Sequence, residues 1–218
     1  MYREDELSQM QKMWWMEAGI RGYKRIMPKL NIGCGNVPIA GYTNVDKYYY
    51  PGSSAPLNDN NLAQTWDKEH PDSPWIYGDA IDLKLPSDSF DEVIMVHMLE
   101  HLSMEHGNLA IREAYNVCKP GGFVEIEVPN VIVACQLLPA LKPNTPLWYR
   151  VMGLLNGTTG IDGEGQFHLC GYSKDYLRFK MEERGFKNIE EIPVGYGHGN
   201  NELGHAEPEF DFRLKGYK

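Results

Sequence analysis

Residues 29–36, with the sequence KLNIGCGN, decide the fold of this chain. The short apolar run from Leu30 to Ile32 has the character of a buried strand, and it leads directly into a turn that carries Gly33 and Gly35. Glycine has no Cβ and adopts positive φ readily, so a ligand can lie directly against the backbone of such a turn. A second strand-like run, residues 42–45, ends at Asp46. This order of strand, glycine turn, strand and acid predicts an α/β fold with a ligand site at the ends of its strands.

The spacing around the turn indicates which ligand binds there. An acid that closes the second strand of such a fold hydrogen-bonds a ribose. The dinucleotide motif also needs a third glycine, a full helix facing the pyrophosphate and a later acid. Residues 36–41 (NVPIAG) leave room for only about one or two helical turns. We therefore predict a nucleoside ligand without phosphates, and S-adenosylmethionine fits, with its ribose, adenine, amino-acid end and sulfonium charge.

Several blocks of the chain resemble class I S-adenosylmethionine-dependent methyltransferases, in the branch of small, type 11-like members. They follow the family order and are residues 30–36 (LNIGCGN), 41–46 (GYTNVD), 77–80 (YGDA), 89–102 (SFDEVIMVHMLEHL) and 118–122 (CKPGG). The resemblance covers about residues 29–130 well and 166–218 more loosely. It departs from many members in two ways, because Asn31 stands where they carry an acid and the first helix is nearly absent.

The resemblance implies an α/β, Rossmann-like, seven-stranded and mostly parallel sheet with helices on both faces and the last strand antiparallel. In similar enzymes, Asp79 would accept a hydrogen bond from the adenine amino group, Ala80 would leave room for the ring, and His97 would line the methionine end. A simple turn cap is the alternative role for Asp79. The cofactor-binding residues implied in this way are Asn31, Gly33, Cys34, Gly35, Asp46, Lys47, Asp79, Ala80, His97 and Met98.

The densest polar cluster follows the apolar run of residues 93–96, where ligands of an open α/β sheet bind. His97, Glu100 and His101 fall at helical spacing there. Methyl transfer depends mainly on holding donor and acceptor at attack distance, and a base is needed if the acceptor is a hydroxyl or a protonated amine. Because histidine titrates near neutral pH, we predict His101 and His168 as the catalytic residues. The alternative is that His101 orders the turn after the strand and that His168 makes an ordinary hydrogen bond.

Metal binding at this cluster is a second possibility. Carboxylate and imidazole bind several divalent ions, and some methyltransferases similar to this chain hold one through a comparable run plus a distant histidine. The corresponding residues here are His97, Glu100, His101 and His168. Because Leu-Glu-His at this position is common in members without metal, we predict none, and the alternative stays open. The His/Glu group at residues 198, 202 and 205 is expected to be a solvated loop.

Two functions follow from these motifs. The first is transfer of a methyl group from S-adenosylmethionine to O or N of a small molecule. The second is a non-catalytic S-adenosylmethionine-binding module within a biosynthetic or regulatory assembly. A dehydrogenase ranks third, because the turn does not fit a pyrophosphate.

Composition limits the partners and the compartment. A formal net charge of −9 and the lack of a clustered basic stretch argue against nucleic-acid binding. No apolar run approaches the length of a membrane span, and the acidic start at residues 4–6 does not suit a signal peptide. The widely spaced cysteines at positions 34, 118, 135 and 170 suit free thiols, so we expect a cytoplasmic protein. Its oligomeric state stays open.

The pattern along the chain predicts one methyltransferase domain over residues 29–218 after an N-terminal segment, residues 1–28. Residues 7–27 read as a helix rich in Met and Trp, which either packs on the sheet or covers the pocket. Residues 131–166 look like a substrate-side insertion with helices at 132–141 and 147–155, a plain flexible loop being the alternative. Further helices are expected at 57–70, 107–118 and 173–185, strands at 76–77, 123–128, 189–194 and 210–217, and a turn at 119–122.

Overall fold

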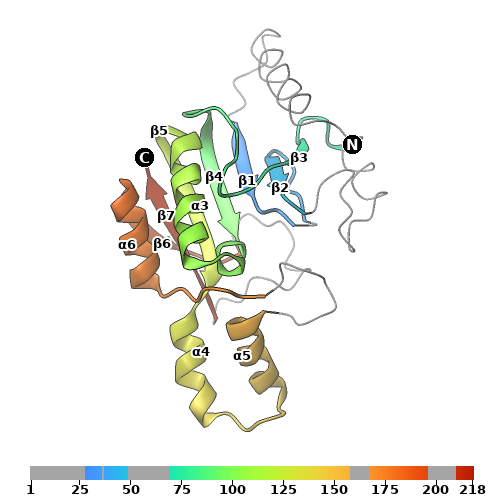
Figure 1. Cartoon of the computed structure of the whole chain (residues 1–218), viewed down its shortest axis with the longest axis vertical. Helices are drawn as coiled ribbons and strands as arrows, with labels where there is room; N and C mark the ends of the chain where they lie inside the picture. Colours follow the sequence, from blue (N-terminus) through green and yellow to red (C-terminus); the bar gives the residue numbers. More distant parts are fainter. Residues whose placement is uncertain (1–27, 36, 49–68, 158–166, 196–209) are drawn as a thin grey trace.

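The structure is a computed structural model, and it describes residues 28–35, 37–48, 69–157, 167–195 and 210–218 (Figure 1). The predicted N-terminal helix at 7–27 lies outside the described residues. So do nearly all of the helix predicted at 57–70 and the His/Glu group at 198, 202 and 205.

A seven-stranded sheet forms the centre of the molecule, with strand order β3-β2-β1-β4-β5-β7-β6 (Figure 1). The first five strands pair in parallel, and β7 runs antiparallel to both of its neighbours. This arrangement confirms the predicted fold class, including the antiparallel last strand. The strands are β1 (Lys29–Ile32), β2 (Thr43–Asp46), β3 (Trp75–Tyr77), β4 (Phe90–Val96), β5 (Cys118–Pro129), β6 (Lys187–Ile192) and β7 (Asp211–Tyr217).

Helices α3 (Met104–Val117) and α6 (Lys174–Arg184) pack side by side on one face of the sheet (Figure 1). Each begins where a serine hydroxyl accepts a backbone N–H of the first turn, at Ser103 and Ser173. Helix α6 ends at Gly185, which adopts the left-handed conformation of a C-terminal cap. Their apolar faces join the central strands in one buried core, which includes Ile32, Val93, Met95, Ala110, Ala114, Val124, Ile126, Leu177 and Met181.

The turn predicted at residues 119–122 is wrong, because these residues belong to β5. The β4–β5 register jumps here, from Phe90 opposite Cys118 to Glu92 opposite Phe123, so the segment is a wide irregularity within the strand. Its backbone hydrogen bonds go to the chain end, since Gly121 N–H donates to the carbonyl of Lys218 at 2.9 Å. The antiparallel partner therefore continues the strand where local sequence favoured a turn.

The described part of the predicted insertion is a helical hairpin that extends from the carboxyl end of the sheet (Figure 1). It consists of α4 (Val131–Leu137), η2 (Leu138–Ala140) and α5 (Pro146–Asn156). Ala134 and Val151 are fully buried between the two helices, and Phe210 packs with them. The predicted helices at 132–141 and 147–155 are thus confirmed, while a role in substrate recognition stays a prediction.

Within the described part of the chain, none of the helices combines the length and the apolar character that a membrane crossing requires.

Candidate functional site

The glycine turn follows β1 and is tied to the neighbouring strand β2. The N–H groups of Gly33 and Cys34 both donate to the carbonyl of Val45, at 2.8 and 3.2 Å. Gly33 and Gly35 have φ of +71° and +55°, a conformation that favours glycine. A Cβ at Gly33 would lie 2.1 Å from Cγ of Met98, so the segment after β4 presses directly on this turn.

Asp46, at the end of β2, holds the same turn. One of its carboxylate oxygens accepts the N–H of Gly35 at 2.9 Å, and the other accepts the N–H of Tyr48 at 2.7 Å. A carboxylate has about four lone-pair positions, so these bonds leave capacity for ribose hydroxyls. Asp46, which the sequence predicts to bind the ribose, therefore lies beside the glycine turn, and its contact with a ribose stays a prediction. Burial, reinforced by the charge of Asp46, raises the pKa of the Cys34 thiol well above its usual value, so this cysteine is an inert thiol that contributes backbone to the turn.

Asn31 does not point at the turn but at a buried neighbour. Its side-chain amide donates to Oδ1 of Asn44 at 3.1 Å, and both residues are almost fully buried. Asn44 in turn accepts the N–H of Ile39 at 2.7 Å and donates to the carbonyls of Ile39 and Tyr42. This pair of amides fixes the connection between β1 and β2, where the described residues form no helix. A direct contact of Asn31 with the cofactor stays a prediction.

Lys47 and Asp79 lie together where β2 and β3 end. Their side chains form an ion pair at 2.8 Å, and the hydrogen bond to Asp79 raises the pKa of Lys47. The second carboxylate oxygen of Asp79 accepts the N–H of Ile81 at 3.3 Å, which fits the alternative role of a turn cap. Ala80 packs against the main core. The structure thus gathers these residues at one place, and their contact with an adenine stays a prediction.

His97 directly follows β4 and has a positive φ of +48°. Its ring lies in a buried cluster of acids. Nδ1 lies 3.1 Å from Glu100, while Nε2 lies 3.5 Å from both Glu127 and Asp211. Burial by itself would lower the pKa of His97, but the hydrogen bonds to Asp211, Glu100 and Glu127 outweigh it and hold that pKa well above its usual value. Arg213 lies on the far side of Glu127, at 3.6 Å. A protonated His97 therefore balances buried carboxylates, and its predicted contact with the methionine end stays untested.

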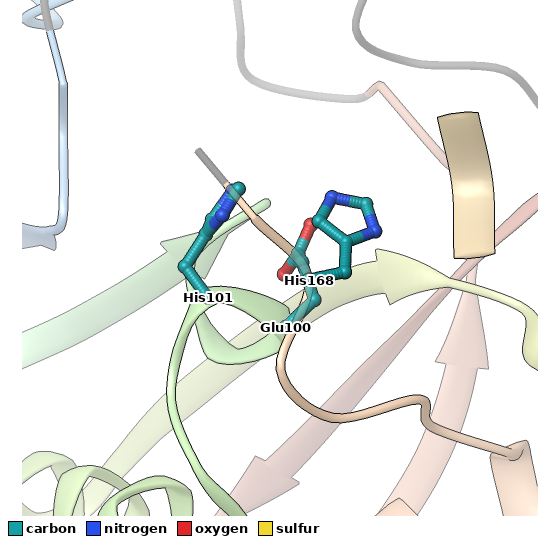
Figure 2. A group of neighbouring side chains, drawn as sticks. All are labelled: Glu100, His101 and His168. Carbon is teal, nitrogen blue, oxygen red and sulfur yellow. The ribbon is translucent and has the colours of Figure 1, made fainter. Parts of the chain in front are cut away.

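The two predicted catalytic histidines, His101 and His168, lie close to each other and to Glu100, the residue that also contacts His97. The rings of His101 and His168 are 5.0 Å apart between centroids and nearly perpendicular. Figure 2 shows their side chains on either side of Glu100, all three extending in the same direction in that view. Burial, with His168 nearby, lowers the pKa of His101 against the opposing charge of Glu100. The ring of His101 is thus a neutral acceptor at neutral pH.

Two backbone contacts bring His168 to this place. Its own N–H donates to the carbonyl of Asn156 at the end of α5, and the N–H of Leu169 donates to the carbonyl of Glu100 at 2.7 Å. The short helix η1 (Leu99–His101) and residues 167–170 are therefore bound to each other. Because the hairpin's second helix fixes His168, the insertion contributes to the geometry of the histidine pair.

Comparison with known proteins agrees with this geometry. A family model described as a methyltransferase domain matches residues 30–126, which contain the glycine turn, Asp46, Asp79 and the end of β4. Residues 30–126 are thus similar to a methyltransferase domain, and the chain shares the fold of S-adenosylmethionine-dependent methyltransferases. The match includes the glycine turn and the acid of β2, the two features that predict S-adenosylmethionine as the methyl donor.

Solved structures of similar fold come from distant members. One is a methyltransferase from Thermotoga maritima, described as a possible histamine N-methyltransferase, at 15% identity over 97% of this chain and 91% of that chain, with a TM-score of 0.53. Another is a methyltransferase from Archaeoglobus fulgidus, at 15% identity over 97% and 94%, with a TM-score of 0.54. Phosphoethanolamine N-methyltransferase 2 of Haemonchus contortus, bound to S-adenosylmethionine, shares 12% identity over 95% of this chain and 52% of that chain, with a TM-score of 0.55.

Sequence reasoning missed several polar residues of the methyltransferase site. Asn44 lies in a strand otherwise predicted from its apolar neighbours, and the strands predicted at 123–128 and 210–217 contain the buried residues Glu127, Asp211 and Arg213. A charged residue inside a buried strand needs a partner, because its desolvation is otherwise unfavourable. The two acids in the predicted strand 123–128 and the alternating charges in 210–217 were the signals that could have predicted a buried ion cluster.

Proposed function

We propose that this enzyme transfers the methyl group to an oxygen or nitrogen atom of a small molecule. The observation that carries the proposal is the pair of imidazoles, His101 and His168, beside the donor turn. Strands β1 and β4 are neighbours, with Ile32 opposite Met95, so the segments that follow them leave the sheet side by side. Met98 then touches Gly33, which places η1 and its histidine directly next to the predicted donor site.

This arrangement supplies what methyl transfer asks of a protein. The sulfonium is already activated, so the main requirement is to hold the acceptor in line with the methyl group at about 3–3.5 Å. A hydroxyl or a protonated amine must also lose a proton, and imidazole is suited to that step near neutral pH. His101 and His168 are therefore the residues that we assign to the acceptor group.

The net charge of the chain supports a small molecule as the methyl acceptor. The net charge of −9 disfavours a nucleic-acid acceptor, because phosphate binding needs clustered Lys and Arg. The hairpin of α4 and α5 stands at the same end of the sheet and exposes apolar side chains, Ile132, Leu147 and Tyr149 among them. We assign to this hairpin the recognition of the acceptor's carbon skeleton.

The proposal is tested in two steps. Calorimetric titration with S-adenosylhomocysteine establishes the donor site, and a panel of small hydroxyl and amine compounds is then screened with labelled S-adenosylmethionine. We expect transfer to at least one class, and a loss of turnover in His101→Gln with S-adenosylhomocysteine affinity retained. The matched control is His106→Gln, an exposed histidine on the first turn of α3. Labelling of nucleic acid or protein with every small compound inert would refute the proposal.

A further inference from the structure

We propose that Glu100, His101 and His168 form a binding site for a divalent transition-metal ion. Each side chain offers one ligand atom, and these atoms all lie within 4.8 Å of one another. Figure 2 shows how they converge, with the two imidazoles flanking the carboxylate. The inference rests on the proposed function, because it concerns the same two histidines, and it gives them the role of holding an ion that lowers the pKa of the acceptor hydroxyl in place of taking the proton themselves.

Both histidines present the nitrogen that a metal requires. Nδ1 of His101 lies 3.2 Å from the carbonyl of Phe167, and Nδ1 of His168 lies 2.8 Å from the carbonyl of Leu154. A carbonyl only accepts hydrogen bonds, so in each ring Nδ1 carries a hydrogen, and in the neutral form of that ring Nε2 carries the lone pair. This second contact, from backbone carbonyl to Nδ1–H, is the one that commonly orients metal-binding histidines.

The carboxylate of Glu100 gives a second observation in favour of a metal ion, independent of the two histidines. Glu100 is only 2% exposed, and its Oε1 lies 3.1 Å from Nδ1 of His97. Its Oε2 is buried and has no hydrogen-bond partner among the residues that the structure describes. Burying a carboxylate oxygen without a partner is unfavourable, and a bound cation would satisfy it.

The site is also held together as a unit. The carbonyl of Glu100 accepts the N–H groups of Leu169 at 2.7 Å and of Cys170 at 3.2 Å. These bonds fix η1 against the segment that carries His168, so the ligands from two distant parts of the sequence keep their spacing. His97 does not belong to the triad, because its Nε2 faces Glu127 and Asp211, which leaves three ligands of the four considered from sequence.

The donor set indicates the kind of ion. Two imidazole nitrogens and one carboxylate suit Zn²⁺, Fe²⁺, Co²⁺ or Mn²⁺, whereas Mg²⁺ and Ca²⁺ prefer oxygen ligands throughout. Three protein ligands leave at least one coordination position for another molecule, as in catalytic zinc sites. The proposed ligand is therefore a divalent first-row transition ion with an open position.

An ion in this place favours a hydroxyl acceptor. A hydroxyl bound to a divalent cation has a lowered pKa and loses its proton to water. The oxygen still has further lone pairs, one of which forms the O–CH₃ bond while the electrons of the S–CH₃ bond return to sulfur. An amine would spend its only lone pair on the metal and could not attack. The inference thus narrows the proposed acceptor to an oxygen nucleophile.

The test is a titration of protein purified without an affinity metal and treated with chelator. Zn²⁺ is followed by calorimetry and Co²⁺ by its visible absorption, which reports the coordination geometry, with Mg²⁺ as the comparison ion. We expect one equivalent of Zn²⁺ or Co²⁺ per chain and at least about tenfold weaker binding in Glu100→Gln and His168→Gln. A glutamine at position 168 keeps an N–H for the Leu154 carbonyl, so it removes the ligand with little disturbance. His106→Gln should bind as the wild type does.

Absence of stoichiometric binding, or equal affinity in His168→Gln and the wild type, would overturn the inference. S-adenosylhomocysteine is titrated into the same preparations to separate this result from the proposed function. If it binds and methyl transfer proceeds fully in the presence of chelator, the enzyme stands and the metal site falls. If it does not bind while Zn²⁺ does, the metal site stands and the proposed function falls.

Discussion

Replacement of Gly33 by alanine tests how closely the donor turn and the acceptor segment are packed. The new Cβ would lie 2.1 Å from Cγ and 2.8 Å from Cβ of Met98, well inside van der Waals contact. Because Cβ is the rigid base of a side chain, rotation of Met98 is not enough and its backbone must shift. Overpacking of this kind costs about 1–3 kcal/mol, and the positive φ adds about 1–2 kcal/mol, so we expect a total loss of about 2–5 kcal/mol.

Gly35→Ala is the matched control. Gly35 also has a positive φ, of +55°, but a Cβ there would meet nothing within 4 Å. Gly35→Ala should lower the free energy of unfolding only by the cost of the positive φ, about 1–2 kcal/mol. Free energies of unfolding from urea titrations of the two variants, without cofactor, separate the two contributions.

The difference in free energy of unfolding between Gly33→Ala and Gly35→Ala is the decisive quantity. Equal losses would refute the close contact between the turn and Met98, and with it the placement of η1 beside the donor. The coupling between Gly33→Ala and Met98→Ala gives an independent measure, since the second substitution removes Cγ, the nearest colliding atom, and leaves only the contact with Cβ at 2.8 Å. A double-mutant cycle with no coupling would contradict the structure in the same way.

Three further predictions concern the polar residues around the turn. Asp46→Ala should weaken S-adenosylhomocysteine binding by about 1–3 kcal/mol in calorimetry, since it removes the acceptor at the end of β2; unchanged affinity would place the ribose elsewhere. Asn44→Ala should lower the free energy of unfolding by about 1–3 kcal/mol, because Asn31 and the β1–β2 connection lose buried partners; a loss below about 0.5 kcal/mol would contradict this. His97→Leu should lower the same quantity by about 3–5 kcal/mol, since it leaves buried carboxylates uncompensated; a stability equal to that of the wild type would show that these acids are neutral.

The fold could be predicted from sequence because its signals are local. The run before Gly33, the acid at position 46 and the serine caps of α3 and α6 each determine a short piece of backbone. Alternating strands and helices then leave few topologies to choose from. The segment 119–122 shows where this reasoning stops, since its backbone partner is the last residue of the chain and no local pattern contains that information.

The candidate site was predicted less completely, for the same physical reason. His97 and its acids come together through the antiparallel pairing of β5 with β7, which sets Glu127 opposite Arg213 and brings Asp211 to the end of β4. Such a register is long-range, and the charges in the two strands do not by themselves show which residues lie opposite each other. From sequence, His101 and His168 could be chosen only for the chemistry of histidine. Their contact could not be predicted, because the segments that carry them, η1 and residues 167–170, are more than sixty residues apart in the chain.

Glu100 explains why adjacent polar residues divide into two clusters. Helical spacing places His97, Glu100 and His101 on one face, but the positive φ of His97 ends that regularity before η1 begins at Leu99. One carboxylate oxygen of Glu100 then faces His97. The same carboxylate also lies close to His101 and His168. The acid cluster that holds His97 thereby helps to orient Glu100 toward His101 and His168. The position of Asp211 on the last strand consequently contributes to the geometry at the histidine pair through His97 and Glu100.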